Sequence, residues 1–121
     1  MSEDNRIQAE SHYYAALDYF GEERYEEAIE QFRRALAIDP AFADAMHGLA
    51  RVLQDLERYD EAIDVAKKIT ELNPEDVLAH TSLSILFQKK GMIAEAETEA
   101  NKARILGWKK QLQEQKIQQK Q

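Results

Sequence analysis

The chain has 121 residues, of which 44% are hydrophobic and 32% charged, a composition typical of a single globular domain. It contains no cysteine, and its longest unbroken apolar run covers only residues 13–17, so the composition excludes disulfides, thiol chemistry and membrane insertion. Most of the net charge of −7 lies in residues 1–76, where 19 acids outnumber 8 bases, and this excess predicts that the chain does not bind nucleic acid.

The spacing of the apolar residues predicts six helices in chain order. Residues 1–8 are polar and acidic and are expected to form a frayed lead-in, with Ile7 as its one apolar anchor. The expected helices cover residues 9–20, 25–38, 41–56 and 59–72, then a segment that ends near residue 90, and finally residues 93–106. Glycines at positions 21, 91 and 107 are expected to end the first, fifth and sixth helices.

Local signals also predict helix starts and one core residue. In Asp39-Pro40 and Asn73-Pro74 the first side chain is expected to cap a helix, and the proline to take its first position, where a missing N–H costs nothing. Phe32 lies in the middle of the apolar stripe of the second helix and is predicted to be buried between the first two helix pairs.

The chain repeats itself with a period of 34 residues. The segment from Tyr25 to Pro40 recurs at residues 59–74 with its Tyr, third-position Glu, Ala-Ile pair and closing Pro unchanged, and a weaker copy covers residues 93–108. Each copy follows another predicted helix, so the repeating unit is a helix, a short turn and a second helix. This length and this pattern of small, aromatic and terminal proline positions resemble the tetratricopeptide repeat.

The resemblance implies an all-α fold, a right-handed α-solenoid of three helix-turn-helix tetratricopeptide repeats with a C-terminal capping helix. The repeats would cover residues 9–110, as units 9–42, 43–76 and 77–110, after the lead-in of residues 1–8. Residues 111–121 are rich in glutamine and lysine and would form the polar capping helix or tail. Trp108 and Leu112, four residues apart, are expected to lay one turn of this cap on the sixth helix.

The histidines raise the question of a metal site. The tryptophan that the family usually carries in its first helix is replaced here by His12, Met46 and His80, which predicts a packing role for these histidines. No two histidines are three or four residues apart, and no zinc-type spacing exists. Neither a glycine-rich phosphate loop nor a nucleophile motif is present, and the carboxylates lie on predicted outer helix faces. We therefore expect no catalytic residue, no metal, no cofactor and no enzymatic activity.

In tetratricopeptide arrays the first helix of each unit lines a concave groove that binds a peptide, and the resemblance implies the same here. The implied groove is apolar at both ends and polar in the middle. The implied partner-binding residues are Tyr13, Tyr14, Leu17, Phe20, His47, Arg51, Gln54, Leu78, Ser82, Ile85 and Gln88, with Gly48 and Thr81 between them. An alternative stays open, in which Tyr13, Leu17 and Ile85 only pack on neighbouring helices.

Heat-shock co-chaperones of this family hold a terminal carboxylate with lysine, asparagine and arginine side chains of the groove. The corresponding residues here are Tyr13, Leu17, Gly48, Leu78 and Ser82. None of them carries a charge, so the comparison implies that the carboxylate tails of heat-shock chaperones are not the ligand.

The sequence thus predicts a non-catalytic protein–protein interaction module, an adaptor, scaffold or assembly factor that holds an apolar or amphipathic partner segment in the groove. The alternative is a scaffold of identical copies, joined through the groove and through oppositely charged ends, because residues 77–121 carry 4 acids against 8 bases. If Met1 is the natural start, the polar first residues predict a cytoplasmic location.

Overall fold

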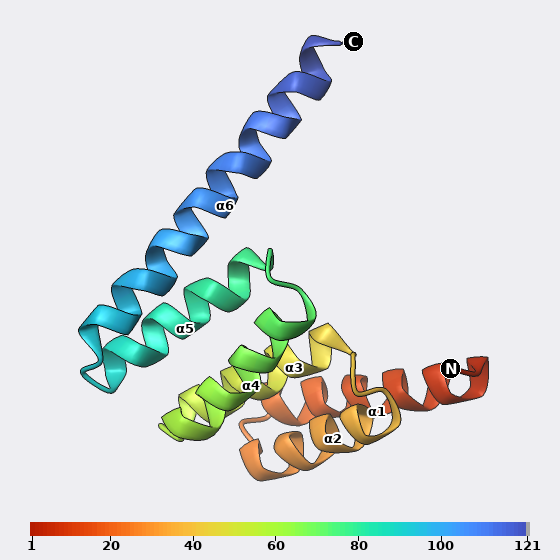
Figure 1. Cartoon of the computed structure of the whole chain (residues 1–121). Helices are drawn as coiled ribbons and strands as arrows, with labels where there is room; N and C mark the ends of the chain where they lie inside the picture. The colour runs from red at the N-terminus through yellow and green to blue at the C-terminus, as the bar shows by residue number, and fades with distance from the viewer. Residues whose placement is uncertain (121) are drawn as a thin grey trace.

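The computed structural model describes residues 1–120, which contain six helices and no strand. The helices are α1 (Glu3–Gly21), α2 (Tyr25–Ile38), α3 (Ala43–Asp55), α4 (Tyr59–Leu72), α5 (Val77–Lys89) and α6 (Ile93–Gln119). They pair as three hairpins, α1 with α2, α3 with α4 and α5 with α6, and the hairpins stack in chain order (Figure 1). The predicted all-α repeat solenoid is confirmed, and the bounds of α2 and α4 are those that the apolar spacing predicted.

The first helix begins six residues earlier than predicted, and the frayed lead-in at residues 1–8 is wrong. Ser2 caps α1 because its hydroxyl accepts a hydrogen bond from the Asn5 N–H at 3.1 Å. Glu3 and Asp4 then place two carboxylates in the first turn, where the helix dipole favours negative charge. Ile7 is exposed and anchors nothing in its own chain.

The turn inside each hairpin uses one left-handed residue at the same repeat position. Glu23 and Glu57 have φ of 60°, and Gly91, the third member of the series, has φ of 76°. Gly21 was expected to end α1 and is its last helical residue. The left-handed residue of this turn, however, is Glu23, two positions later. Only the third turn places a glycine where the backbone favours one.

The turns between hairpins do not begin the next helix in the predicted way. The Asp39 carboxylate accepts a hydrogen bond from the Ala41 N–H at 3.2 Å, and the Asn73 side chain does the same for the Glu75 N–H at 3.1 Å. These side chains build a local turn around the proline, so neither caps a helix. The caps lie three residues later, and Asp76 accepts from the Ala79 N–H at 2.9 Å to begin α5.

The sixth helix passes through Gly107 and continues to Gln119, so the expected stop at Gly107 is wrong, and the polar residues 111–119 are a helical continuation of α6. Gly107 has no positive φ, and no proline follows it to prevent the helix from continuing. A glycine inside a helix costs only about 1 kcal/mol relative to alanine. The lysines and glutamines that follow Gly107 are good helix formers, so the helix continues despite this cost. Trp108 is 65% exposed and does not fold back on α6.

The core lies between the first and second units around Phe32, which is 1% exposed, as predicted. Its ring lies against Gly48 of α3, and a Cβ atom at Gly48 would stand 2.4 Å from the Phe32 Cζ atom. The absence of a side chain at Gly48 therefore lets α2 and α3 approach closely.

Both ends of the stack are polar at the positions that carry apolar contacts inside it. Val52 and Leu86 are buried, whereas their repeat equivalent in α1 is the exposed Asp18. Ile63 is buried in α4, and its equivalent in α6 is the exposed Glu97. A further unit stacked in the same way would bury an unpaired carboxylate, which costs several kcal/mol.

Candidate functional site

The predicted groove positions lie on α1, α3 and α5, and we call their exposed side chains the first-helix face. Its α1 end presents Tyr14 and Leu17, which are 60% and 39% exposed. Its α5 end presents Leu78 and Ile85, which are 59% and 39% exposed. The α3 helix contributes the exposed Arg51 and the half-buried Gln54, which are both polar. The α5 helix adds the half-buried Ser82 and the exposed Gln88 beside its apolar residues. Large apolar side chains are thus left in water at both ends of this face.

Two of the predicted aromatic binding residues, Tyr13 and Phe20, are partly buried and pack against the hydrophobic core. The Tyr13 ring centroid lies 6.0 Å from that of Phe32 and 5.1 Å from that of Phe42. Burial raises the pKa of the Tyr13 phenol, and the carboxylate of Asp44 raises it further. The half-buried Phe20 packs in the same manner, with its ring centroid 5.8 Å from that of Tyr25. The packing alternative therefore describes Tyr13, whereas Leu17 and Ile85 remain partly open to solvent.

The predicted polar contact His47 is already bound within the chain. Its Nε2–H donates to the Asp76 carboxylate at 2.9 Å, and the same carboxylate caps α5. Partial burial alone would raise the pKa of Asp76. Hydrogen bonds from His47 and the Ala79 N–H, with the charges of His47 and His80, outweigh that effect and hold the pKa below its usual range. His47 therefore ties α3 to the start of α5 and is not free to contact a ligand.

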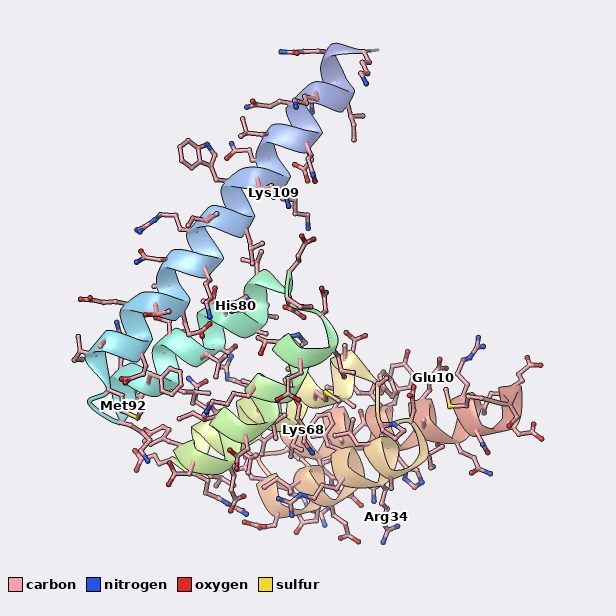
Figure 2. All side chains as sticks on the ribbon, viewed as in Figure 1. Glu10, Arg34, Lys68, His80, Met92 and Lys109 are labelled. Carbon is pink, nitrogen blue, oxygen red and sulfur yellow. The ribbon has the colours of Figure 1, made fainter. Side chains whose placement is uncertain are left out.

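His80 and His12 occupy the packing slot that the sequence predicted, and each also bonds to the second helix of its unit. The buried His80 lies between α5 and α6 (Figure 2), with Nε2 2.7 Å from the Pro74 carbonyl and Nδ1 2.6 Å from the Glu99 carboxyl. The carbonyl can only accept, so Nε2 carries a proton and a second proton lies between Nδ1 and Glu99. His12 meets Gln31, the repeat equivalent of Glu99, at 2.7 Å.

The buried polar side chains all have hydrogen-bond partners in the described part of the chain. Within residues 1–120 no buried side-chain nitrogen or oxygen lacks a hydrogen-bond partner. In the same residues no three histidine, cysteine or acidic side chains gather closely enough to hold a metal ion. None of the helices described there combines the length and apolar character that crossing a membrane requires.

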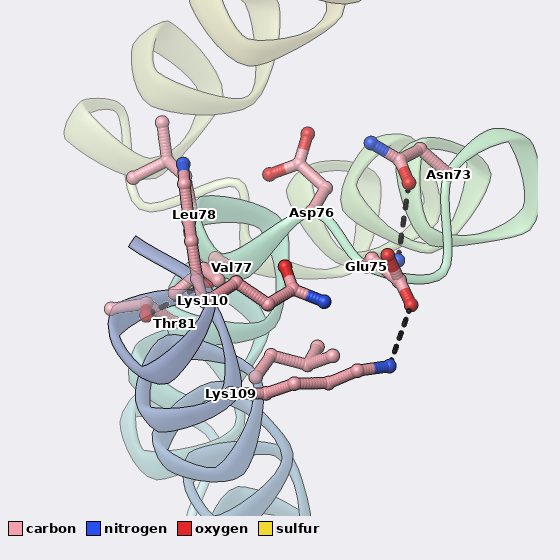
Figure 3. A pocket seen from close by; sticks show the side chains of 10 residues that line it. Asn73, Glu75, Asp76, Val77, Leu78, Thr81, Lys109 and Lys110 are labelled. Atoms are coloured by element: carbon pink, nitrogen blue, oxygen red, sulfur yellow. Dashed lines mark hydrogen bonds and ion pairs between the residues drawn. The ribbon is translucent and has the colours of Figure 1, made fainter. Parts of the chain in front are cut away.

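A cleft of about 740 Å³ lies where α6 passes the start of α5 (Figure 3). The turn between α4 and α5 forms one wall, and the continuation of α6 forms the other. The lining residues are Asn73, Glu75, Asp76, Val77, Leu78, Thr81, Leu106, Lys109, Lys110 and Gln113. Lys109 closes one side through an ion pair with Glu75 at 3.4 Å. The sequence predicted only Leu78 and Thr81 here, because the α6 wall exists only when that helix passes Gly107.

The charges around the first-helix face are acidic at its α1 end. Asp44, the carboxylate that acts on Tyr13, lies on α3, and its repeat equivalent Glu10 is exposed on α1. Arg51 is matched within its own helix by Asp55, whose carboxylate lies 3.2 Å from the Arg51 guanidinium. This end of the face therefore carries negative charge beside its exposed apolar side chains.

Stacked helix hairpins with a 34-residue period define an α-solenoid repeat protein. A family model for the tetratricopeptide repeat matches residues 19–86, more than half of the chain, and the chain belongs to this family. It is 32% identical over 75 residues to the DnaJ protein P58IPK homolog of Arabidopsis thaliana, covering 62% of this chain and 16% of that protein. It is 35% identical over 75 residues to the uncharacterized protein ycf37 of Cyanophora paradoxa, covering 60% of this chain and 44% of that one. The chain thus spans less than half the length of both relatives.

Solved structures share the fold over most of the chain. MamA superposes with a TM-score of 0.83 at 28% identity, covering 85% of this chain and 60% of that one. The second TPR of Spaghetti (RPAP3), bound to the HSP90 peptide SRMEEVD, gives 0.79 at 25% identity, covering 85% and 95%. The translocator chaperone SycD of Yersinia enterocolitica type III secretion gives 0.77 at 23% identity, covering 81% and 73%, and shows likeness of fold alone.

Proposed function

We propose that this protein is a non-catalytic adaptor or scaffold that holds an apolar or amphipathic segment of a partner protein against its first-helix face. The family supports the broader role of a protein–protein interaction module. The observation that carries the finer proposal is the exposure of Tyr14, Leu17, Leu78 and Ile85 on that face. Exposed apolar groups that flank a polar strip are the usual carriers of binding energy for an amphipathic helix.

The residues of the first-helix face differ in burial, and we propose a different role for the buried and for the exposed ones. Tyr13 and Phe20 form its floor, because their rings pack on the core. Tyr14 and Leu17 stand above that floor and are the anchors that a partner would cover. Gln54 and the largely exposed Arg51, whose pair with Asp55 is open to solvent, remain for hydrogen bonds to a partner, because His47 is already bound to Asp76.

The proposal includes the absence of catalysis and a cytoplasmic location. The histidines, which are the side chains best suited to proton transfer near neutral pH, are engaged in contacts between helices. Such contacts support a structural role for them. Fluorescence microscopy of the tagged chain at its natural level tests the location.

The proposal also excludes the acidic tail of a heat-shock chaperone as ligand. The Spaghetti domain that shares this fold was solved with the HSP90 peptide SRMEEVD. Here the five positions of the carboxylate-binding set are uncharged, and the nearby carboxylates of Glu10 and Asp44 would repel an acidic peptide. Calorimetry with SRMEEVD is expected to give no heat of binding at micromolar concentrations, and micromolar affinity would contradict this part of the proposal.

The experiment for the main proposal begins with a photo-crosslinking side chain at position 14 of the full chain in native lysate. Mass spectrometry then names the captured protein, and a titration measures its affinity for variants. Tyr14→Ala and Leu17→Ala are expected to weaken binding by about 1–3 kcal/mol, a factor of roughly ten to a hundred.

Two variants outside the face serve as controls. Leu72→Ala removes an exposed leucine from α4, and Arg34→Ala removes an exposed charge on α2 that points away from the body (Figure 2). Both are expected to bind as the natural chain does. Loss of affinity in the control variants, with affinity kept in Tyr14→Ala and Leu17→Ala, would place the working surface on the second helices.

A further inference from the structure

The last part of α6 projects beyond the rest of the stack. We call residues 107–119 the α6 tail, and from Trp108 onward all of its side chains are exposed. Figure 1 shows this segment leaving the α5–α6 hairpin with no other helix beside its end. Thirteen residues of helix span about 20 Å. A helix of this length without a packed face is marginal in water, so burial of one face against a partner would stabilise it.

An apolar row begins just before the tail and continues into it, on the side of α6 away from α5. Ile105, Trp108 and Leu112 are three and four residues apart, which places them on one helix face, and all three are exposed. The opposite side of the helix, with Leu106 and Lys110, lines the cleft against α5. Within residues 1–120 nothing covers the Ile105–Trp108–Leu112 row.

The tail is also basic. Four lysines, at positions 109, 110, 116 and 120, lie in or directly after the tail against the single acid Glu114. Only Lys109 pairs with a carboxylate in the described part of the chain, the one at Glu75. The segment therefore combines an uncovered apolar row with flanking positive charge.

The α1 end of the first-helix face has the complementary chemistry. Tyr14 and Leu17 are its exposed apolar groups, the exposed Glu10 lies four residues before Tyr14 on the same helix, and the Asp44 carboxylate acts on the neighbouring Tyr13. Three first helices packed about 10 Å apart span about 20 Å, which is also the length of the tail. Length, apolar surface and charge all match between the two elements.

We propose that the α6 tail of one copy binds to the first-helix face of a second copy, with the Ile105–Trp108–Leu112 row on Tyr14 and Leu17. The tail lysines then lie beside Glu10 and Asp44. This inference rests on the proposed function and names a second copy of the chain as the partner. The contact joins two copies because α6 leaves the stack from the last hairpin, whereas α1 belongs to the first (Figure 1).

Such a contact joins unlike surfaces. Each copy offers one tail and one face, so the contact repeats head to tail and gives an open chain or a closed ring. A direct pairing of two α6 tails would instead bring their lysines together, and like charges oppose that arrangement.

The test uses two full-length variants that each destroy one half of the contact. Trp108→Glu puts a carboxylate into the apolar row of the tail, and Leu17→Glu puts one into the face. Mass photometry and sedimentation measure the species formed at low salt. The natural chain is expected to form larger species as its concentration rises, whereas each variant alone stays monomeric.

Mixing the two variants gives the decisive measurement. Trp108→Glu keeps an intact face and Leu17→Glu keeps an intact tail, so an equimolar mixture is expected to give a 1:1 dimer and nothing larger. Gln118→Glu in the tail and Leu72→Glu on α4 make the same change of charge away from the contact, and both are expected to assemble as the natural chain does. Circular-dichroism melts confirm that all four variants are folded.

Three results would overturn the proposal. A natural chain that stays monomeric at every concentration would show that copies do not associate. A Leu17→Glu variant that dimerises alone would indicate that tails pair with tails. A Trp108→Glu variant that assembles alone would indicate that faces pair with faces. If any of these occurs while Leu17→Ala still weakens binding of a foreign partner roughly tenfold or more, the proposed function stands and only the partner named here is wrong.

Discussion

At Gly48 a hydrogen atom in place of a methyl group decides how closely two helices of neighbouring units approach. The Phe32 ring occupies the space that a Cβ atom would need, with contacts of 2.4 and 2.5 Å to two ring carbons. The pattern of the first unit predicts a buried Phe32, but nothing in the local sequence indicates that the residue across from it must be glycine. The two positions form one packing unit.

Phe32→Ala is expected to lower the free energy of unfolding by about 3–5 kcal/mol, because it leaves a cavity under Gly48 in a small stack. Urea denaturation followed by circular dichroism measures the change. A loss below about 1 kcal/mol would show that the ring is not part of the core.

Gly48→Ala tests the same contact from the other side. The alanine gains helix propensity, but the clash with the Phe32 ring is expected to make the net change destabilising by about 1–3 kcal/mol. In a Phe32→Leu background the same substitution is expected to cost clearly less, and a double-mutant cycle measures this coupling. Equal costs in both backgrounds would mean that the ring and Gly48 do not constrain each other.

Asp76 links two helices through one carboxylate, and its lowered pKa gives the link a pH dependence. Because the folded pKa lies below the unfolded value of 3.8, the stabilisation is fully present above that value and is lost as the pH falls through the folded pKa. Asp76→Asn is therefore expected to destabilise the chain by about 1 kcal/mol at pH 7 and by progressively less below about pH 4. Urea titrations across this pH range measure the difference, with the exposed Asp64→Asn as the control. A difference that stays constant down to pH 3 would contradict the assignment.

At the scale of the element, α6 departs from the two second helices that precede it. The helices α2 and α4 end before an Asp-Pro or Asn-Pro turn, whereas the third unit has Gly107-Trp108 at that position and the helix continues. A glycine ends a helix when its backbone turns to the left-handed region, as at Gly91, and Gly107 does not do so. The conformation of each glycine, more than its presence, decides where these helices stop.

Two glycine substitutions are therefore expected to have opposite effects. Gly107→Ala adds a methyl group that meets nothing within 4 Å and should stabilise the α6 tail by about 1 kcal/mol, seen as slower amide hydrogen exchange around the site. Gly91→Ala forces alanine to φ of 76° and should destabilise the α5–α6 hairpin by about 1 kcal/mol, seen in urea denaturation. Faster exchange in Gly107→Ala would indicate that the tail is bent at that residue.

At the scale of the whole molecule, charge is separated along the stack. Residues 1–76 carry 19 acids against 8 bases, and residues 77–121 carry 4 against 8. A fourth unit stacked in the same way would meet the exposed carboxylate of Asp18 or Glu97, so the contact proposed between copies uses the first-helix face and the α6 tail instead. If copies associate as proposed, the contact joins oppositely charged parts of the molecule.

Such attraction makes self-assembly depend on salt. Light scattering is expected to show larger species at low salt and monomers near about 0.5 M, because the screening length falls from about 10 Å at 0.1 M toward about 3 Å at 1 M. A variant with Lys109, Lys110 and Lys116 all changed to glutamine is expected to lose most of this dependence. A particle mass that is the same at every salt concentration would contradict assembly through electrostatic attraction.

The sequence by itself determined the repeat, the family and most helix bounds. A chain that repeats every 34 residues can be compared with itself, and that comparison placed α2 and α4 at Tyr25–Ile38 and Tyr59–Leu72 and predicted the burial of Phe32. It also predicted that Leu17 and Leu78 belong to one binding surface; both are exposed, and their shared role stays a prediction. These properties follow from periodicity within one or two turns of helix, which the order of residues records directly.

Only the tertiary structure decided which polar groups are free and where the last helix ends. His47 meets Asp76 across 29 residues and His80 meets Glu99 across 19, and no local pattern predicts such pairs. The cleft and the α6 tail exist because Gly107 stays helical, and the presence of a glycine does not by itself show whether its backbone is helical or left-handed. Contacts between distant segments are chosen by packing of the whole stack, so the partners of each side chain appear only when the helices are in place.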